Sequence, residues 1–241
     1  MGFDTAVILS AGLGTRMRPL TETTPKPLLP LGGRPILAHT VERLHEAGVK
    51  RIIVNAHYLA DQIEAFLRPY PNVTVTREGE LQDTGGAVTA MLAKNLLPEE
   101  PFYVVNGDTY WVDGPNPTLP RMERAFDAAR TDVVLLLVRA AGAVAETGQG
   151  GFIWPRDGAL RRRGERDVAP YLYSGVQLVS PALFAAAPAE PFSMNVLWDR
   201  ALAAGRCDAV VHDGIWFHLS TPEDLAQAQG ALDAREVGNT T

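Results

Sequence analysis

The 241-residue sequence contains a single cysteine, Cys207, and no long apolar run. One thiol can neither form an internal disulfide nor build a thiolate metal site alone, so we expect Cys207 to be a buried or half-buried small hydrophobe. No apolar run approaches the roughly 18 residues that cross a bilayer. The first residues, MGFDTAVILSAG, lack the basic start and long apolar stretch of a signal peptide. We therefore expect a cytoplasmic protein with no membrane partner.

The sequence also lacks an excess of positive charge. It has 22 Lys and Arg against 28 Asp and Glu, a formal net charge of −6. A general nucleic-acid surface needs a net basic face, so we expect no nucleic-acid partner. A local cationic pocket for a phosphorylated small molecule stays compatible with this balance. Hydrophobic residues make up 46% and charged residues 21%, as in a globular protein with a real core.

Strand and helix patterns alternate through the first half of the chain. Runs rich in β-branched residues and bounded by turn residues predict strands over 5–9, 51–56, 73–76, 102–106 and 133–138. Apolar residues at helical spacing predict helices over 36–47, 85–97 and 119–130, the first of them stopped by Gly48. This alternation indicates a parallel sheet with helices on both faces, whose ligands bind beyond the carboxyl ends of the strands.

The alternation weakens after about residue 140. The stretch from 150 to 180 predicts short antiparallel strands and turns, a small lid over the sheet edge. Helices are expected over 194–205 and 221–234, the second with Thr221 as its N-cap and Pro222 at its first position. We expect the final EVGNTT to be frayed. The length suits one domain over 1–241.

The first strand leads into an unusual loop, LSAGLGTRMRPLTETTPKPLLPLGGRP, at residues 9–35. Gly12 and Gly14 can take positive φ and expose backbone amides that cradle an anion. Arg16 offers a bidentate fork to phosphate oxygens, and Lys26 a mobile point charge. The alternative is a surface turn with solvated cations. The spacing matches neither the dinucleotide fingerprint G-x-G-x-x-G nor a P-loop.

The longer string resembles a known family. AVILSAGLGTRMRPLTETTPKPLLPLGGRPIL is similar to the signature of the sugar-1-phosphate nucleotidylyltransferases. Further matches follow in order: LQDTGGAV (81–88), NGDTYW (106–111), YSGVQLVSPALF (173–184) and WFHLSTPEDLAQA (216–228). The resemblance covers essentially the whole chain. Within the family, the chain most resembles the short bacterial N-acetylmuramate-1-phosphate uridylyltransferases.

The resemblance implies a fold and a reaction. The fold is a Rossmann-like, GT-A-like nucleotidyltransferase fold: a mostly parallel sheet flanked by helices, with a nucleotide-binding half at about 1–139 and a sugar-binding half at about 140–235. The reaction joins an NTP to a sugar 1-phosphate and releases pyrophosphate. A phosphate oxygen attacks the α-phosphorus directly, so the protein supplies positioning and charge neutralisation instead of a nucleophile.

The resemblance also implies site residues. Arg16, Lys26 and Asp108 are the expected catalytic groups. The expected nucleotide-binding residues are Ala11, Gly12, Leu13, Gly14, Thr15, Arg16, Lys26, Gln82, Thr84 and Gly85, with Glu80 as a further candidate for a base contact. The expected sugar-binding residues are Asn106, Ser174, Gly175 and Asn195. Asp108 is expected to hold a divalent cation, Mg²⁺ with Mn²⁺ as an alternative.

Each of these assignments has a structural alternative. Asp108 can be a turn residue, and the buried Asn and strand Gly candidates can serve packing alone. Thr84 is expected to cap a helix as well as to contact the nucleotide. The basic run RRRGER (161–166) is expected to form a solvated hairpin, with phosphate binding as the alternative. His39, His45 and His57 are too scattered to predict a metal cluster or a triad.

One position departs from the family pattern. The family's second metal-binding aspartate stands in W-x-D-x-G-T, whereas this chain has WFHLST, with His218 in the place of the aspartate. Imidazole is a poorer Mg²⁺ ligand than carboxylate but suits Mn²⁺ and other transition metals. We expect His218 to be a second metal ligand; the alternative is a hydrogen bond to water or phosphate.

Three functions remain open at this point. The first is uridylyl transfer from UTP to N-acetylmuramate 1-phosphate in peptidoglycan recycling. The second is guanylyl transfer to mannose 1-phosphate or a heptose phosphate. The third is a regulatory protein that binds nucleotide sugars without turnover; intact Arg16, Lys26 and Asp108 argue against it. The sequence sets no oligomeric state.

Overall fold

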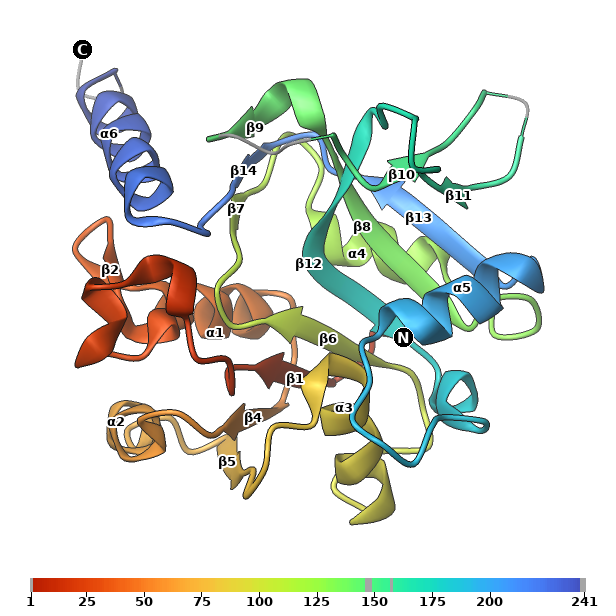
Figure 1. Cartoon of the computed structure of the whole chain (residues 1–241), viewed down its shortest axis with the longest axis horizontal. Coiled ribbons are helices and arrows are strands. Elements are labelled where there is room, and N and C mark those ends of the chain that lie inside the picture. The colour runs from red at the N-terminus through yellow and green to blue at the C-terminus, as the bar shows by residue number, and fades with distance from the viewer. Residues whose placement is uncertain (1, 146–148, 157, 239–241) are drawn as a thin grey trace.

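The structure is a computed structural model that describes residues 2–145, 149–156 and 158–238. Its centre is a mixed sheet whose first half is parallel (Figure 1). Four strands lie there in the order β6-β1-β4-β5: Phe102–Asn106, Thr5–Leu9, Arg51–Ala56 and Val73–Arg77. These strands confirm the sequence prediction. Their carboxyl ends meet at one edge, as parallel pairing requires.

The second half of the sheet continues beyond β6 through antiparallel pairing. Strand β12 runs antiparallel to both β6 and β8, and β13 adds parallel to β8. Strands β10 and β11 form the antiparallel pair expected of a small lid. The bounds are Val133–Arg139 for β8, Phe152–Ile153 for β10, Arg161–Arg162 for β11, Tyr171–Val179 for β12 and Cys207–Val211 for β13.

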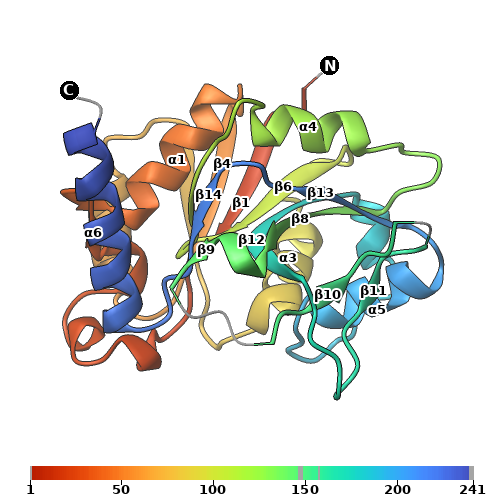
Figure 2. The same cartoon turned by 90° about the horizontal axis from the view of Figure 1, so that it is seen from above.

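Helices cover both faces of the sheet (Figure 2). The helices α1, α2 and α4 pack on one face around a core that includes Leu37, Ile63 and Met122. The helices α3 and α5 pack on the other, where Val88 and Trp198 lie in a second core. The bounds are Ile36–Glu46 for α1, Ala60–Leu67 for α2, Asp83–Ala93 for α3, Thr118–Ala125 for α4 and Asn195–Ala203 for α5.

Two helix predictions were wrong in detail, and no helix was predicted at the position of α2. Helix α3 begins at Asp83, whose φ is 57°, so Thr84 lies inside the helix and does not cap it. Helix α4 ends at Ala125, five residues before the predicted end, because Phe126 is extended and its ring packs edge-on against Phe3. A tertiary contact of this kind overrides the local helical pattern.

The C-terminal helix α6 (Pro222–Gly238) packs beside the opening loop (Figure 1). Leu225 and Ala228 of α6 share a small core with Met17 and Leu29 of that loop. Thr221 accepts a hydrogen bond from the amide of Asp224, as expected of an N-cap. The helix extends to Gly238, within the EVGNTT end that we expect to be frayed, and residues 239–241 of that end lie outside the described residues.

Two further sequence predictions can be compared with the fold. Cys207 is half-buried in β13, and burial raises the pKa of its thiol to about 12, so it stays protonated at neutral pH. Among the helices of the described residues, none combines the length and the apolar character that a membrane crossing requires.

Candidate active site

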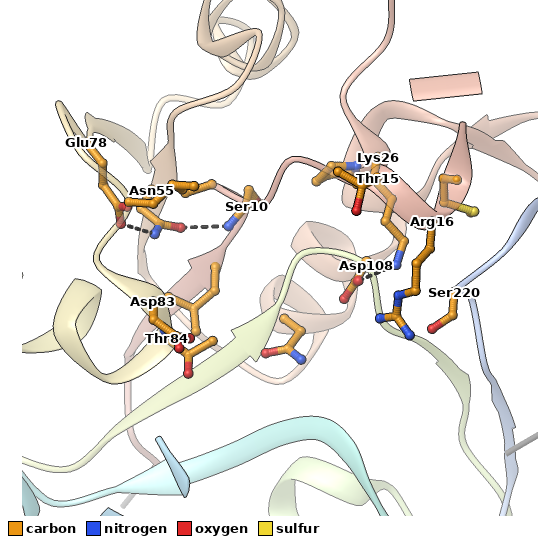
Figure 3. A pocket seen from close by; sticks show the side chains of 18 residues that line it. Ser10, Thr15, Arg16, Lys26, Asn55, Glu78, Asp83, Thr84, Asp108 and Ser220 are labelled. Carbon is orange, nitrogen blue, oxygen red and sulfur yellow. Dashed lines mark hydrogen bonds and ion pairs between the residues drawn. The ribbon is translucent and has the colours of Figure 1, made fainter. Parts of the chain in front are cut away.

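The carboxyl ends of β1, β4, β5 and β6 border a cavity of about 500 Å³ (Figure 3). Its walls come from the opening loop, from the ends of these strands, from the start of α3 and from the segment before α6. The lining includes Ser10, Ala11, Gly12, Gly14, Thr15, Arg16, Lys26, Asn55, Glu78, Asp83, Thr84, Asn106, Asp108 and Ser220. This is the sheet edge at which the sequence placed a ligand.

A left-handed glycine and a threonine fix the shape of the opening loop. Gly14 has φ 63°, and its carbonyl accepts a hydrogen bond of 2.8 Å from the hydroxyl of Thr21. A Cβ on Gly14 would lie 3.0 Å from the Thr21 side chain and 3.2 Å from Lys26 Cβ. Among the described residues, the amides of residues 11–16 find no hydrogen-bond acceptor. The loop therefore presents unsatisfied donors to an anion.

Gly12 contributes space to the cavity. Its φ is not positive, contrary to the sequence prediction, and nothing lies within 4 Å of the place where a Cβ would stand. Gly12 and Gly14 therefore have different roles. Gly14 fixes the loop, and Gly12 lets a ligand approach the backbone closely.

Lys26 and Asp108 form an ion pair across the cavity floor. Lys26 Nζ lies 2.5 Å from Asp108 Oδ2, with the lysine side chain 10% exposed and the aspartate 39%. Asp108 reaches this position because Gly107 lets the ends of β1 and β6 meet: a Cβ there would stand 2.2 Å from Ser10 Oγ. The structure thus brings together two of the three expected catalytic groups.

Arg16, the third expected catalytic group, extends from the opening loop toward Ser220, beside Asp108 (Figure 3). Its side chain is exposed and forms no ion pair within the described ranges. A guanidinium without a protein partner keeps its fork of donors available to phosphate oxygens.

A second wall of the cavity contains residues that the sequence reasoning missed. Asn55 Oδ1 accepts a 2.6 Å hydrogen bond from the Ser10 amide, and its Nδ2 donates to Glu78 Oε1 at 2.5 Å. Glu78 directly follows β5, and Asn55 is the one polar residue in the buried part, IIVNA, of β4. The rule that ligands bind at the carboxyl ends of parallel strands points to both positions.

The segment around the start of α3 lines the cavity with different residues from those expected. Leu81, Asp83 and Thr84 face it, whereas Gln82, Gly85 and Glu80 do not. The Gln82 side-chain amide donates to the Glu80 carbonyl at 3.2 Å. Leu13 of the opening loop also lies outside the lining.

Gly85 allows close approach by a protein side chain. Its amide donates to the Phe192 carbonyl at 2.8 Å, and a Cβ on it would lie 2.3 Å from the Phe192 ring. We had expected this glycine to admit the nucleotide to the backbone. The structure fills that space with Phe192, because the α3 start packs against the segment before α5.

A smaller cavity of about 330 Å³ adjoins the first and shares Thr84 and Asn106 with it. Asn195, at the start of α5, lines it as expected. Its remaining walls include Gly151, Phe152, Arg162, Tyr173, Ser193 and Trp198. Arg162 belongs to the basic run that was expected to form a solvated hairpin. The antiparallel pair of β10 and β11 is present, and Arg162 lies half-buried in it beside the cavity.

Ser174 and Gly175 line neither cavity. The Ser174 carbonyl accepts hydrogen bonds from Thr109 Oγ1 at 2.5 Å and Trp216 Nε1 at 2.9 Å. Gly175 has φ 90° at a bulge in β12, where a Cβ would lie 3.1 Å from Thr109. Ser174 and Gly175 therefore hold β12 against the loop that contains Asp108. This is a packing role, the structural alternative given for these residues in the sequence analysis.

His218 follows β14 (Ile215–Phe217) and lies outside the cavity lining. Its Nε2 is 3.9 Å from Asp224 Oδ2. Burial lowers the pKa of His218, and the nearby charges of Lys26 and Arg16 lower it further. The carboxylates of Asp224 and Asp108 act in the opposite direction and raise this pKa, but the net shift is downward. The imidazole is therefore neutral at pH 7. Its role as a metal ligand stays a prediction.

The donor set around Asp108 fits a cation shared with a substrate. The carboxylate is a hard oxygen ligand, partly exposed in the cavity. Within the described ranges, no group of three or more His, Cys, Asp or Glu side chains gathers in a metal-binding arrangement. One carboxylate with substrate phosphates and water is a usual way to hold Mg²⁺.

Comparisons with known proteins agree with this geometry. The model of the MobA-like NTP transferase domain matches residues 6–145. N-acetylmuramate alpha-1-phosphate uridylyltransferase of Caulobacter vibrioides is 36% identical over 234 residues, 94% of this chain and 96% of that protein. Mannose-1-phosphate guanyltransferase beta-A of Xenopus laevis is 31% identical over 91% of this chain, which spans 62% of that protein.

Solved structures support the fold. A UDP-glucose pyrophosphorylase complexed with UDP-glucose superposes with a TM-score of 0.76 at 20% identity, covering 97% of this chain and 99% of its own. The match of the family model to more than half of the chain, and that of the Caulobacter protein to nearly all of it, confirm the resemblance found in the sequence. The chain belongs to the MobA-like NTP transferase family and, within it, to the sugar-1-phosphate nucleotidyltransferases.

Proposed function

We propose that this enzyme transfers the uridylyl group of UTP to N-acetylmuramate 1-phosphate. A phosphate oxygen of the sugar phosphate forms a bond to the α-phosphorus of UTP. The bond from that phosphorus to the oxygen bridging to the β-phosphate breaks, and pyrophosphate leaves. UDP-N-acetylmuramate is the other product, and the reaction has a place in peptidoglycan recycling.

The observation that carries the proposed transfer is the Lys26–Asp108 pair beside the unsatisfied loop amides, in a cavity that adjoins a second one. The amides of residues 11–15 and Arg16 bind the triphosphate and the departing pyrophosphate. Lys26 neutralises charge on the α-phosphate. Two adjoining cavities hold the two substrates in line, which supplies much of the rate enhancement in phosphoryl transfer.

Asp108 would hold a divalent cation, Mg²⁺ or Mn²⁺, together with the phosphates of the nucleotide. The cation, when bound, neutralises charge on the phosphoryl oxygens. With a cation at Asp108, Lys26 would be free to bind the substrate, because both partners of the pair would then have a new opposite charge.

The match to the Caulobacter uridylyltransferase supports the choice of substrates, because it extends over nearly the full length of both proteins. The Xenopus guanyltransferase, which this chain spans over 62% of its length, keeps guanylyl transfer to mannose 1-phosphate as the second candidate. A cytoplasmic location is part of the proposal, since UTP is a cytoplasmic metabolite.

The test is a matrix of five nucleotides (UTP, GTP, CTP, ATP and dTTP) against N-acetylmuramate, N-acetylglucosamine and mannose 1-phosphates. Pyrophosphate release and product chromatography report turnover with Mg²⁺ present. We expect the highest kcat/KM for UTP with N-acetylmuramate 1-phosphate. A preference for GTP with mannose 1-phosphate would replace our proposal with the second candidate, and binding without turnover would favour a regulatory protein.

A further inference from the structure

One wall of the smaller cavity contains an arginine whose partners are mostly uncharged. Arg162, in β11, donates from Nη1 to Asn195 Oδ1 at 2.7 Å. Its guanidinium carbon stands 5.3 Å from the centre of the Phe152 ring and 5.9 Å from that of Trp198. These contacts fix the position of the guanidinium, whose ion pair with Asp199 is long, at 3.8 Å.

The carboxylate near Arg162 is too distant to satisfy it. Asp199 Oδ1 lies 3.8 Å from Nε, beyond hydrogen-bond distance, and its side chain is 60% exposed. Asn195 uses one of the five guanidinium donors. Most of the guanidinium N–H donors therefore remain available to a ligand. The Arg162 side chain is 36% exposed.

A second polar side chain, Tyr173, borders the same cavity. Its hydroxyl is buried and makes no hydrogen bond within the described residues. Burial raises the pKa of Tyr173, and the nearby Asp108 raises it further, so the phenol stays neutral. Because the hydroxyl oxygen is not accessible from the cavity, Tyr173 lines the cavity with its ring and brings no charge that could compete with Arg162 for a ligand.

The chemistry of the arginine narrows the ligand. Neutral sugar hydroxyls are recognised by amides, hydroxyls and aromatic faces, which Asn195, Ser193 and Trp198 already supply. A fixed guanidinium fork instead fits a planar carboxylate in two parallel hydrogen bonds. The 1-phosphate of the sugar has its counter-charges in the neighbouring cavity, at Arg16 and Lys26.

We propose that Arg162 is a specificity-determining residue that binds a carboxylate carried by the sugar itself. The inference rests on the proposed function, because N-acetylmuramate differs from N-acetylglucosamine by a lactyl ether that ends in a carboxylate. Mannose 1-phosphate and N-acetylglucosamine 1-phosphate have no such group. Arg162 then distinguishes an acidic from a neutral amino sugar.

The experiment compares two substrates that differ only in the lactyl group, on matched variants. The readout is the ratio of kcat/KM for N-acetylmuramate 1-phosphate to that for N-acetylglucosamine 1-phosphate, with UTP. Because a charge-assisted bidentate pair is lost, Arg162→Gln should lower the ratio about 10- to 100-fold. Arg162→Lys, which keeps the charge but not the fork, should lower it less.

Arg161→Gln is the matched control. It lies in the same strand with the opposite orientation, bonds Asp167 at 3.1 Å and lies outside the cavity lining. We expect its ratio to equal that of the unaltered enzyme. Thermal unfolding of each variant reports the fold independently of activity.

The outcomes separate the two proposals. An unchanged ratio in Arg162→Gln overturns the role of Arg162 and leaves uridylyl transfer standing. A common loss on both substrates also overturns it, because Arg162 would then only shape the cavity. An unaltered enzyme that uses neutral sugar phosphates and ignores the acidic one overturns the substrate assignment and the Arg162 proposal together. If no sugar phosphate is turned over, the proposed function itself fails.

Discussion

The ammonium nitrogen of Lys26 lies 2.5 Å from Oδ2 of Asp108, although 82 positions separate the two residues in the sequence. They meet because β1 and β6 are neighbours in the sheet, and each residue belongs to the segment that follows one of these strands. In the free enzyme each charge compensates the other. A bound polyanion would replace Asp108 as the partner of Lys26, and a bound cation would replace Lys26 as the partner of Asp108. Binding of the polyanion and binding of the cation are therefore coupled.

Removing either of the two opening-loop cations that line the cavity, Arg16 or Lys26, should lower turnover without unfolding the protein. For Lys26→Ala and Arg16→Ala we expect kcat/KM to fall about 10²- to 10³-fold, because each removes charge that stabilises the phosphoryl oxygens in the transition state. Arg18→Ala is the control: Arg18 is exposed in the same loop and does not line the cavity. Rates of folded Lys26 and Arg16 variants within a few-fold of the control would contradict this role.

Replacing Asp108 with asparagine should abolish the dependence of activity on divalent cations. The change keeps the size of the side chain but removes the charge that anchors the ion. Rates measured against Mg²⁺ concentration should be near background at every concentration. If the variant kept the Mg²⁺ dependence of the unaltered enzyme, the cation would have to be bound elsewhere.

Gly85 and Gly12 offer a matched pair of substitutions. Gly85→Ala places a Cβ 2.3 Å from the buried Phe192 ring, and we expect it to lower the free energy of unfolding by about 1–3 kcal/mol. Gly12→Ala meets no atom within 4 Å and should leave stability unchanged while it raises the KM for the nucleotide. Chemical denaturation and steady-state kinetics measure both. Equal stability of the two variants would show that the packing of Gly85 against Phe192 is dispensable.

The sequence predicted the strands better than the details of the site. The runs TAVIL, RIIVNA and FYVVN have the bounds of β1, β4 and β6, because near-continuous apolar runs are typical of parallel strands that are covered on both faces. The positions of Lys26 and Asp108 could be predicted for the same reason, because both residues lie in segments that follow such strands. The end of α4 could not be predicted from the local sequence, since it depends on the contact between Phe126 and Phe3.

The second cavity was the hardest part to foresee. Arg162 stands in a run of three arginines, which by composition alone predicts a solvated surface. Its position depends on Asn195 and Trp198, more than 30 residues further along the chain. Gly85 shows the converse: its sequence context suggested a ligand, whereas Phe192 fills the space beside it.

The metal-ligand prediction for His218 can be tested by two substitutions. If the imidazole binds the cation beside Asp108, His218→Asp should raise activity with Mg²⁺ relative to Mn²⁺, because a carboxylate is the harder ligand. His218→Asn should weaken Mn²⁺-supported activity. The measurement is the ratio of kcat/KM with each metal. Identical ratios in His218→Asn and the unaltered enzyme would favour the alternative, in which Asp108 alone binds the cation.

The stability of the fold should depend on pH through His212. This side chain is 4% exposed, with Nδ1 2.9 Å from Thr118 Oγ1 and Nε2 3.2 Å from the Val112 carbonyl. Burial lowers the pKa of His212 below its ordinary value, although the Ile215 carbonyl and the Asp113 carboxylate act in the opposite direction. The unfolded chain therefore takes up a proton at His212 at a higher pH than the folded chain does.

The sign follows from linkage. As pH falls from 7 through about 6.5, protonation favours the unfolded state, and the free energy of unfolding decreases until the folded pKa is reached. The half-buried His218, whose pKa is also lowered, acts in the same direction. Urea unfolding at pH 7.5, 6.5 and 5.5 should show this decrease, and His212→Asn should show a smaller one. A free energy of unfolding that rises toward pH 5.5 would contradict a lowered pKa of His212, and an equal slope in His212→Asn would show that His212 does not cause the decrease.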